Sequence, residues 1–191
     1  NNCSDNEMFG ILLINYCDNN TISDNTASNN GVVLDGNGIC LENHCYNNNI
    51  SGNIVRNKGI SQITGIELSS SCSDNTISGN TSEYIGGGIY FNFTSATIVN
   101  NIISGNYAES YGAGIYCAYQ SSPDITDCEI TDCGDGGIIC NYGSNAHISS
   151  CQITNNESKQ GGGIAAEDSS SITVTDCIIT GNYAPVAGGV F

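Results

Sequence analysis

The 191-residue sequence predicts an all-β chain that coils into a single parallel β-solenoid of about seven rungs. Three observations predict this fold. Two sequence landmarks recur about every 26 residues along the chain, the hydrophobic pattern around each landmark has a period of two, and turn-forming residues separate the short apolar stretches. A period of this length, made of short strands and turns, is typical of one rung of a parallel β-solenoid.

The two landmarks are an isoleucine in segments that resemble N-T-I-S-G-N and a glycine that precedes an aliphatic residue. The isoleucines are Ile22, Ile50, Ile77, Ile103, Ile130, Ile153 and Ile179. The glycines are Gly10, Gly38, Gly65, Gly88, Gly114, Gly137, Gly163 and Gly189. Because the two landmarks stay in step, we expect equivalent residues of successive rungs to lie directly above one another, with Ile77 and Ile103 as vertical neighbours.

Short strands are expected after the landmark glycines. In the segments 66–68 and 89–91 the first and third side chains fall on one face of an extended chain. The segments 125–130 and 148–153 are expected to form two short strands with a bend between them. Glycine, asparagine, aspartate and serine supply the turns, and no helix-length apolar stripe with caps occurs.

A single rung is not expected to fold alone. Each of its roughly four or five buried aliphatic side chains contributes about 1.5–3 kcal/mol. Ordering the backbone costs roughly 1–2 kcal/mol for each of about 26 residues. Hydrogen bonds and apolar contacts between rungs must therefore supply the difference.

Asparagine recurs at two positions relative to the landmark isoleucines, and we expect structural ladders there. Stacked amides can donate to one another and satisfy backbone groups in the turns. Two positions before the isoleucine, the ladder residues are Asn20, Asn48, Asn75 and Asn101. Three positions after it, they are Asn25, Asn53, Asn80, Asn106, Asn156 and Asn182.

The eleven cysteines follow the same repeat. The first expected stack lies five positions before the isoleucine, is continued by aliphatic residues in later rungs, and consists of Cys17, Cys45 and Cys72. Two further stacks are expected at Cys128, Cys151 and Cys177, and at Cys117 and Cys140. We expect mainly buried thiols, with disulfides between rungs as the alternative. No paired C-x-x-C motifs are present, so we predict no metal on the cysteines.

Acidic residues occupy alternate rungs, three positions before the isoleucine, at Asp74, Asp127 and Asp176. Carboxylates on adjacent rungs would repel by about 3.5 kcal/mol at an effective dielectric constant of 20, and doubling their separation halves this energy. We interpret these residues as spaced solubilising charges. Calcium bridging between them is the alternative, and no other cofactor is expected.

The charge balance excludes several classes of protein. Nineteen acidic residues against three basic ones give a net charge of −16, whereas nucleic-acid binding needs a basic surface. No apolar run approaches the roughly 20 residues of a transmembrane helix, so we predict no membrane span.

The cysteine content and the N-x-S/T sequons favour a secreted or cell-surface protein. The possible glycosylation sites are Asn19, Asn49 and Asn92.

The repeats resemble those of right-handed parallel β-helix proteins in the pectate-lyase-like superfamily. Residues 20–25 and 75–80 are similar to the repeats of NosD-type periplasmic proteins. Residues 103–106 with 112–115, and 179–182 with 188–190, are similar to polymorphic outer-membrane adhesin repeats. The resemblance implies a right-handed β-helix over nearly the whole chain. It does not select a function, because adhesins, surface proteins and polysaccharide enzymes share this scaffold.

The sequence contains no evident catalytic set. Arg56 and Lys58 lie in one loop, and Lys159 lies four rungs away, roughly 19 Å along the rod, so these bases cannot converge. His44 and His147 occur singly. The densest acidic group covers one rung, could include two convergent carboxylates, and consists of Asp124, Asp127, Asp132 and Asp135.

We therefore expect a non-catalytic extracellular structural or adhesive rod, with carbohydrate binding or polysaccharide cleavage near residues 124–135 as the alternative. Residues 1–191 are expected to form one solenoid domain without evident caps. Such a domain is either a slice of a longer solenoid or a subunit that associates end to end in a filament, sheath or surface layer. The expected partners are further copies of the chain or cell-surface and glycan contacts.

Ice binding is a third alternative, since it needs a flat, exposed threonine array. In the predicted alignment Thr131, Thr154 and Thr180 follow serines of earlier rungs, so the expected array is short.

Overall fold

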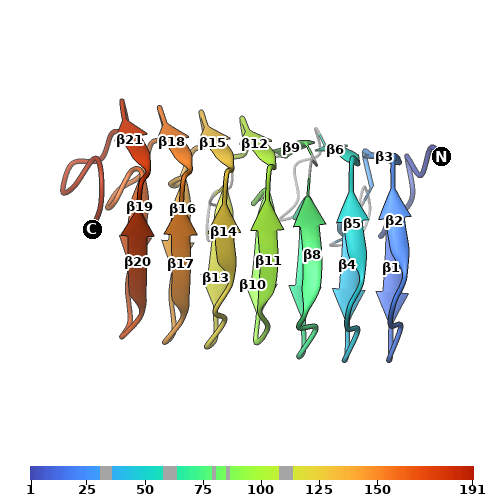
Figure 1. The fold of residues 1–191 in the computed structure, drawn as a ribbon. Coiled ribbons are helices and arrows are strands. Elements are labelled where there is room, and N and C mark those ends of the chain that lie inside the picture. Colours follow the sequence, from blue (N-terminus) through green and yellow to red (C-terminus); the bar gives the residue numbers. More distant parts are fainter. Residues whose placement is uncertain (31–35, 58–63, 79–80, 85–86, 108–113) are drawn as a thin grey trace.

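The chain forms a rod of stacked coils. A computed structural model describes residues 1–30, 36–57, 64–78, 81–84, 87–107 and 114–191. These residues form 21 short strands and no helix, which confirms the all-β prediction. The strands build three parallel sheets of seven strands each. Figure 1 shows the coils stacked along one axis, with the two chain ends at opposite ends of the rod.

Each coil contributes one strand to each sheet in turn. Sheet 1 contains β1 (Ile11–Ile14), β4 (Ile39–Glu42), β7 (Ile66–Ser69), β10 (Ile89–Asn92), β13 (Ile115–Ala118), β16 (Ile138–Cys140) and β19 (Ile164–Ala166). Sheet 2 contains β2 (Thr21–Ser23), β5 (Asn49–Ser51), β8 (Asn75–Ser78), β11 (Ala96–Val99), β14 (Asp124–Thr126), β17 (Asn145–Ser149) and β20 (Ser171–Thr175). Sheet 3 contains β3 (Thr26–Ser28), β6 (Ile54–Asn57), β9 (Thr81–Tyr84), β12 (Ile102–Ser104), β15 (Glu129–Thr131), β18 (Gln152–Thr154) and β21 (Ile178–Thr180).

The core lies between the three sheets and consists of columns of aliphatic side chains. In sheet 2, Ile98 is fully buried between the exposed Thr97 and the half-buried Val99, as the period of two predicts. The first inward column of sheet 1 is Ile11, Ile39, Ile66, Ile89, Ile115, Ile138 and Ile164. The glycine landmark therefore marks the same sheet in every coil, and the predicted repeat of about 26 residues is confirmed.

The predicted register of the isoleucine landmark is wrong in the middle of the chain. Ile77 of β8 pairs with Ile98 of β11, whereas Ile103 of β12 pairs with Ile130 of β15. The landmark isoleucines thus belong to sheet 2 up to Ile77 and to sheet 3 from Ile103 onward. The physical reason is that sheets 2 and 3 end in similar corners, so similar residues mark both.

The corner between sheets 2 and 3 explains much of the asparagine, aspartate and glycine content. One residue in each of several coils has a positive φ there, for example 53° at Asp24, 54° at Asn100 and 52° at Asp127. Asn, Asp and Gly adopt this left-handed conformation at the least cost. The chain consequently turns within one residue, and the next side chain points into the core.

Close approach of neighbouring coils explains the landmark glycine at the start of sheet 1. A Cβ atom on Gly137 would lie 2.5 Å from the carbonyl oxygen of Gly163 and 3.0 Å from Ile153 Cγ2. The backbone oxygen cannot move away without breaking the stack. A larger residue at this position would therefore force neighbouring coils to shift.

No helix in the described part of the chain has the length and apolar character needed to cross a membrane.

Candidate functional site

Three of the predicted ladder asparagines form a hydrogen-bonded row where the coils enter sheet 2. The main-chain nitrogen of Asn20 donates to Asn48 Oδ1 at 2.8 Å, and that of Asn48 donates to Asn75 Oδ1 at 2.8 Å. Asn75 Nδ2 donates to the carbonyl oxygen of Cys45 at 2.8 Å. Because Asn48 and Asn75 are buried, these amides satisfy backbone groups that water cannot reach.

Asn101 belongs to a different row from the one predicted. Asn101 Nδ2 donates to the carbonyl oxygen of Ile77 at 2.8 Å, at the corner between sheets 2 and 3. Asn53 Nδ2 makes the same contact to Ile22 at 2.9 Å. With the corrected register, this row consists of Asn25, Asn53, Asn101, Cys128, Cys151 and Cys177. The predicted ladder residue Asn80 lies outside the described residues.

The remaining ladder asparagines follow sheet 3 and not sheet 2. The main-chain nitrogen of Cys133 donates to Asn156 Oδ1 at 3.0 Å, and that of Asn156 donates to Asn182 Oδ1 at 2.9 Å. Asn106 precedes Cys133 in this row, with its Nδ2 atom 3.8 Å from Cys133 Sγ. Asn106, Asn156 and Asn182 therefore do not stack on Asn25 and Asn53, because the register changes between the third and fourth coils.

Cys17, Cys45 and Cys72 lie at the corner between sheets 1 and 2. The main-chain nitrogen of Cys45 donates to Cys72 Sγ at 3.3 Å. Later coils place hydroxyl side chains in this row, since the Thr94 nitrogen donates to Ser121 Oγ at 3.2 Å. The predicted continuation by aliphatic residues is therefore wrong. Small side chains occupy the row, and four of them accept a hydrogen bond from the backbone of the preceding coil: Cys72, Ser121, Ser144 and Ser170.

All eleven cysteines are thiols in the structure. Cys117 and Cys140 pair in sheet 1 and are fully buried in the core. Burial raises the pKa of the Cys72 thiol to about 11. Two effects raise the pKa of the Cys151 thiol: the larger is its hydrogen bond with Cys128, and the second is its burial. The thiols of Cys72 and Cys151 are therefore protonated at neutral pH, and the buried cysteines pack as small hydrophobic groups.

The three calcium candidates do not form one row. Asp74 precedes sheet 2, whereas Asp127 and Asp176 precede sheet 3, again because the register changes after Ile77. Asp127 and Asp176 are separated by the coil that holds Ser150, and all four residues have positive φ. Their conformation accounts for the choice of short polar side chains. In the described part of the chain, no group of three His, Cys, Asp or Glu residues is placed to hold a metal ion.

The predicted acidic group is spread over three sides of the rod. Asp124 contacts His147 Nδ1 at 3.2 Å on the outer face of sheet 2. Asp127 lies at the corner between sheets 2 and 3. Asp132 and Asp135 line an open groove beyond sheet 3. Only these two of the four acids therefore share a candidate site.

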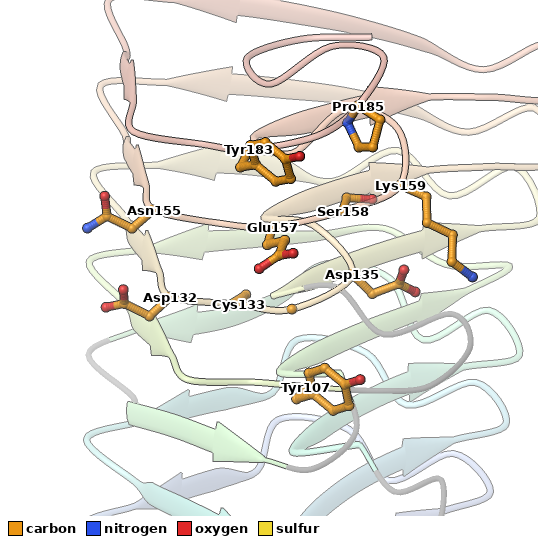
Figure 2. A pocket seen from close by; sticks show the side chains of 11 residues that line it. Tyr107, Asp132, Cys133, Asp135, Asn155, Glu157, Ser158, Lys159, Tyr183 and Pro185 are labelled. Atoms are coloured by element: carbon orange, nitrogen blue, oxygen red, sulfur yellow. The ribbon is translucent and has the colours of Figure 1, made fainter.

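The groove has a volume of about 620 Å³ and lies between two exposed tyrosines (Figure 2). Tyr107, Gly134, Glu157 and Tyr183 are backbone partners in four successive coils. The two tyrosines are therefore three strand spacings apart, about 14 Å. Their exposed fractions are 57% and 61%. Figure 2 shows Glu157 between the two rings.

Glycine at position 134 allows the Tyr107 ring to lie along the groove. A Cβ atom on Gly134 would be 2.4 Å from Cδ2 of Tyr107. The ring therefore occupies the space that a side chain would fill. This contact fixes one wall of the groove, while the backbone nitrogen of Tyr183 donates to Asn156 O at 2.8 Å and positions the other.

The groove combines aromatic walls with an acidic floor. Its formally charged side chains are Asp132, Asp135, Glu157 and Lys159, so negative charges outnumber positive ones. Aromatic walls with a few polar groups between them are typical of small-molecule sites. The negative balance disfavours acidic ligands and favours neutral or cationic ones.

Sequence reasoning missed Tyr107, Glu157 and Tyr183 as groove residues. The available signal was that a tyrosine directly follows the ladder residues Asn106 and Asn182. Lys159, predicted not to converge with Arg56 and Lys58, lines the same groove. Arg56 lies in β6 of sheet 3, and Lys58 is outside the described residues.

A second group of aromatic residues lies at the corner between sheets 1 and 2. The ring centroids of Phe93 and Tyr119 are 5.1 Å apart, and those of Tyr119 and Tyr142 are 4.8 Å apart. The near-parallel rings stack on one another, so their faces are largely occupied. This row contributes to the stacking of the coils; Tyr119 and Tyr142 are 39% and 36% exposed, less than the two groove tyrosines, whereas Phe93 is 56% exposed. His44 similarly stacks on Tyr16 at 5.1 Å.

The possible glycosylation sites differ in exposure. Asn19 and Asn49 are exposed, and Asn49 lies on the outer face of sheet 2. Asn92 ends β10, and its side-chain oxygen is buried. Asn19 and Asn49 are thus the more accessible acceptors.

The family comparison agrees with the observed architecture. The family model described as "Right handed beta helix region" matches residues 1–82 and 62–191, which together cover the chain. No curated protein matches the chain. The stacked parallel coils and this match together confirm the predicted resemblance, and the chain belongs to the right-handed β-helix family.

Proposed function

We propose that the protein is a non-catalytic structural or adhesive rod, secreted or displayed on a cell surface. The main observation in support is the uninterrupted stacking of the coils. Three seven-stranded sheets run along the rod, and buried rows of Asn, Cys and Ser side chains close its corners. Such a scaffold holds its shape over its length and presents outward side chains at fixed spacings.

The last described coil has apolar core-facing side chains that are only partly buried. Ile172, Val174 and Ile179 face the core but are only partly buried, because no described coil covers them. A further coil would bury this apolar surface, whether it comes from the same polypeptide or from a second molecule. End-to-end association is the form in which we propose that two copies would meet.

Analytical ultracentrifugation over a hundredfold concentration range, combined with negative-stain microscopy, tests the association. End-to-end stacking predicts species that lengthen with concentration at constant width. Val174→Lys would charge the terminal surface and should abolish lengthening, whereas Thr97→Lys, away from that surface, should not. A monomer at all concentrations would contradict end-to-end association.

Carbohydrate binding in the groove is the second candidate function, and the pair of exposed tyrosines supports it. Tyr107 and Tyr183 offer apolar rings with hydroxyl groups, and Glu157 and Asp135 offer hydrogen-bond acceptors between them. Because the groove is acidic, neutral oligosaccharides are the favoured ligands. Cleavage would use the carboxyl groups of Glu157 and Asp135.

Calorimetry with neutral and acidic oligosaccharides tests this second candidate. Tyr107→Ala and Tyr183→Ala should each weaken binding at least tenfold, while Tyr16→Ala, which is exposed outside the groove, should leave it unchanged. Release of reducing ends that is lost in Glu157→Gln would indicate cleavage. Equal binding by the wild-type protein and the three tyrosine variants would exclude the groove as the carbohydrate site.

A further inference from the structure

The outer face of sheet 2 carries a regular array of hydroxyl groups. The residues on either side of the inward aliphatic residue form two outward columns along the rod, from which Ser78, outside the described side chains, is left out. Thirteen residues of these columns have described side chains, and all are exposed or half-buried. Nine of them carry a hydroxyl group: Thr21, Ser23, Ser51, Thr76, Thr97, Thr126, Ser149, Thr173 and Thr175.

The corrected register creates this array. Because Ile77 pairs with Ile98, Thr76 of β8 lies beside Thr97 of β11. Side chains in adjacent strands are aligned, as the 3.0 Å contact between Thr126 Oγ1 and Ser149 Oγ shows. Neighbouring strands are about 4.8 Å apart, and alternate residues of a strand are about 6.6 Å apart. Six of the nine residues are threonines, whose β-branched side chains are stiff at χ1, so their hydroxyl groups are restricted to few positions on this grid.

The face is almost uncharged, although the chain carries a net charge of −16. Among its thirteen described side chains, the ionisable ones are Asp124 and His147, which contact each other at 3.2 Å. Apart from the His147 ring, the described side chains of the array contain no aromatic group. A neutral partner meets no electrostatic penalty on this face, whereas the groove and corners of the rod are acidic.

The other two sheets present different outer surfaces. In sheet 3, Ile102 and Ile178 are 46% and 57% exposed, and Glu129 is exposed in the same column, so the surface is chemically mixed. In sheet 1, the outward Tyr116 and Ala165 are buried. Among the described surfaces, sheet 2 is the exposed face with one dominant chemistry.

We propose that the outer face of sheet 2 binds ice. Each hydroxyl group can donate one hydrogen bond and accept two, which suits a lattice of water molecules. The threonine methyl groups restrict the water between them. Because the parallel strands already hold these groups on a rigid grid, little side-chain entropy is lost when the grid meets an ordered solid. A glycan chain fits the face less well, because the array offers no aromatic platform for a sugar ring.

Nanolitre osmometry and ice-recrystallisation assays test the proposal with protein from a host that does not glycosylate Asn49. The wild-type protein should shape ice crystals, produce a measurable thermal hysteresis and inhibit recrystallisation. Thr97→Lys places a bulky charge in the centre of the array and should reduce the hysteresis at least fivefold. Gln152→Lys places the same charge on the exposed face of sheet 3 and should leave the hysteresis unchanged.

Circular dichroism should show that both variants keep the β-sheet signal. Wild-type protein without any effect on ice growth would overturn the proposal. Equal loss of activity in both variants would also overturn it, since the effect would then not depend on sheet 2. Binding to crystalline cellulose or chitin that requires Thr97, with no ice activity, would assign the face to a polysaccharide instead.

Discussion

Asn101 Nδ2 donates a 2.8 Å hydrogen bond to the main-chain oxygen of Ile77 in the preceding coil. One coil later, Cys128 Sγ lies 3.8 Å from the equivalent oxygen of Ile98. An amide and a thiol thus occupy the same row because each can reach the equivalent main-chain carbonyl of the preceding coil. A buried carbonyl left without a partner costs about 1–3 kcal/mol, so these contacts help to determine which side chains the corner accepts.

Removing the amide of Asn101 should destabilise the rod. Asn101→Ala leaves the Ile77 oxygen without this donor and should lower the free energy of unfolding by about 1–3 kcal/mol. Asn101→Cys should lower it less, because cysteine fills the row in later coils. Urea titrations followed by circular dichroism measure both values, with the exposed Asn49→Ala as control. Equal losses in Asn101→Ala and Asn49→Ala would show that the row contributes nothing.

A central core isoleucine should matter far more than an exposed one. Ile125 is fully buried between Ile98 and Ile148, whereas Ile102 is 46% exposed. Ile125→Ala should cost about 2–5 kcal/mol through lost burial and the resulting cavity. Ile102→Ala should cost less than about 1 kcal/mol. Similar losses in the two variants, measured by urea unfolding, would be incompatible with the assignment of the two faces.

Position 137, which is a glycine, should not tolerate a residue with a side chain. A Cβ atom there would meet the Gly163 oxygen at 2.5 Å, so Gly137→Ala must push two coils apart. The substitution should lower the free energy of unfolding by at least about 1–3 kcal/mol. Gly189→Ala is the control, because a Cβ atom there would contact nothing within 4 Å. Thermal unfolding of the two variants provides the comparison, and an unchanged midpoint for Gly137→Ala would refute the close approach.

Stability should fall with increasing pH in the alkaline range. Burial raises the pKa of the Cys72 thiol from 9.0 to about 11. Between these values the native state binds more protons than the unfolded state, so this contribution is complete below pH 9 and is lost as pH rises toward 11. Cys72→Ala should weaken the dependence in this window, although it lowers stability at neutral pH.

The matched variant for this experiment is Cys3→Ala, because Cys3 lies outside the buried core. Its unfolding free energy should decline between pH 9 and 11 as steeply as that of the wild-type protein. Urea unfolding at a series of pH values under reducing conditions supplies the slopes. Parallel slopes for wild type and Cys72→Ala would argue against a buried thiol at position 72.

The fold could be predicted because its physical causes repeat along the chain. The glycine before each strand of sheet 1 is required by the close approach of the next coil, so Gly88, Gly114 and Gly137 mark equivalent positions reliably. The alternation of apolar and polar residues in the strands reports their inward and outward faces. These requirements act within one coil or between neighbours, and the sequence therefore reveals them.

The register of sheets 2 and 3 could not be predicted in the same way. Both sheets end in a residue with positive φ followed by an inward Asn or Cys, as at Asn100–Asn101 and Gly105–Asn106. Segments from two different sheets therefore look alike in sequence. The coil between the paired residues Ile77 and Ile98 is also shorter than its neighbours, which hides the change.

The groove depends on contacts that no periodic signal reports. Tyr107 and Tyr183 are separated by Gly134 and Glu157 in their row, so the tyrosines do not repeat from coil to coil. The position of the Tyr107 ring follows from the missing Cβ of Gly134 in the next coil. Such a relationship becomes apparent only when the register is known.

Nuclear Overhauser contacts between main-chain protons of isotopically labelled protein test the stacking of the coils most directly. The observed pairing predicts cross-strand contacts that place Ile77 beside Ile50 on one side and Ile98 on the other. Strong backbone contacts between the Ile77 and Ile103 strands, with none to the Ile98 strand, would contradict this arrangement. They would also remove the aligned columns on which the hydroxyl face and the buried rows depend.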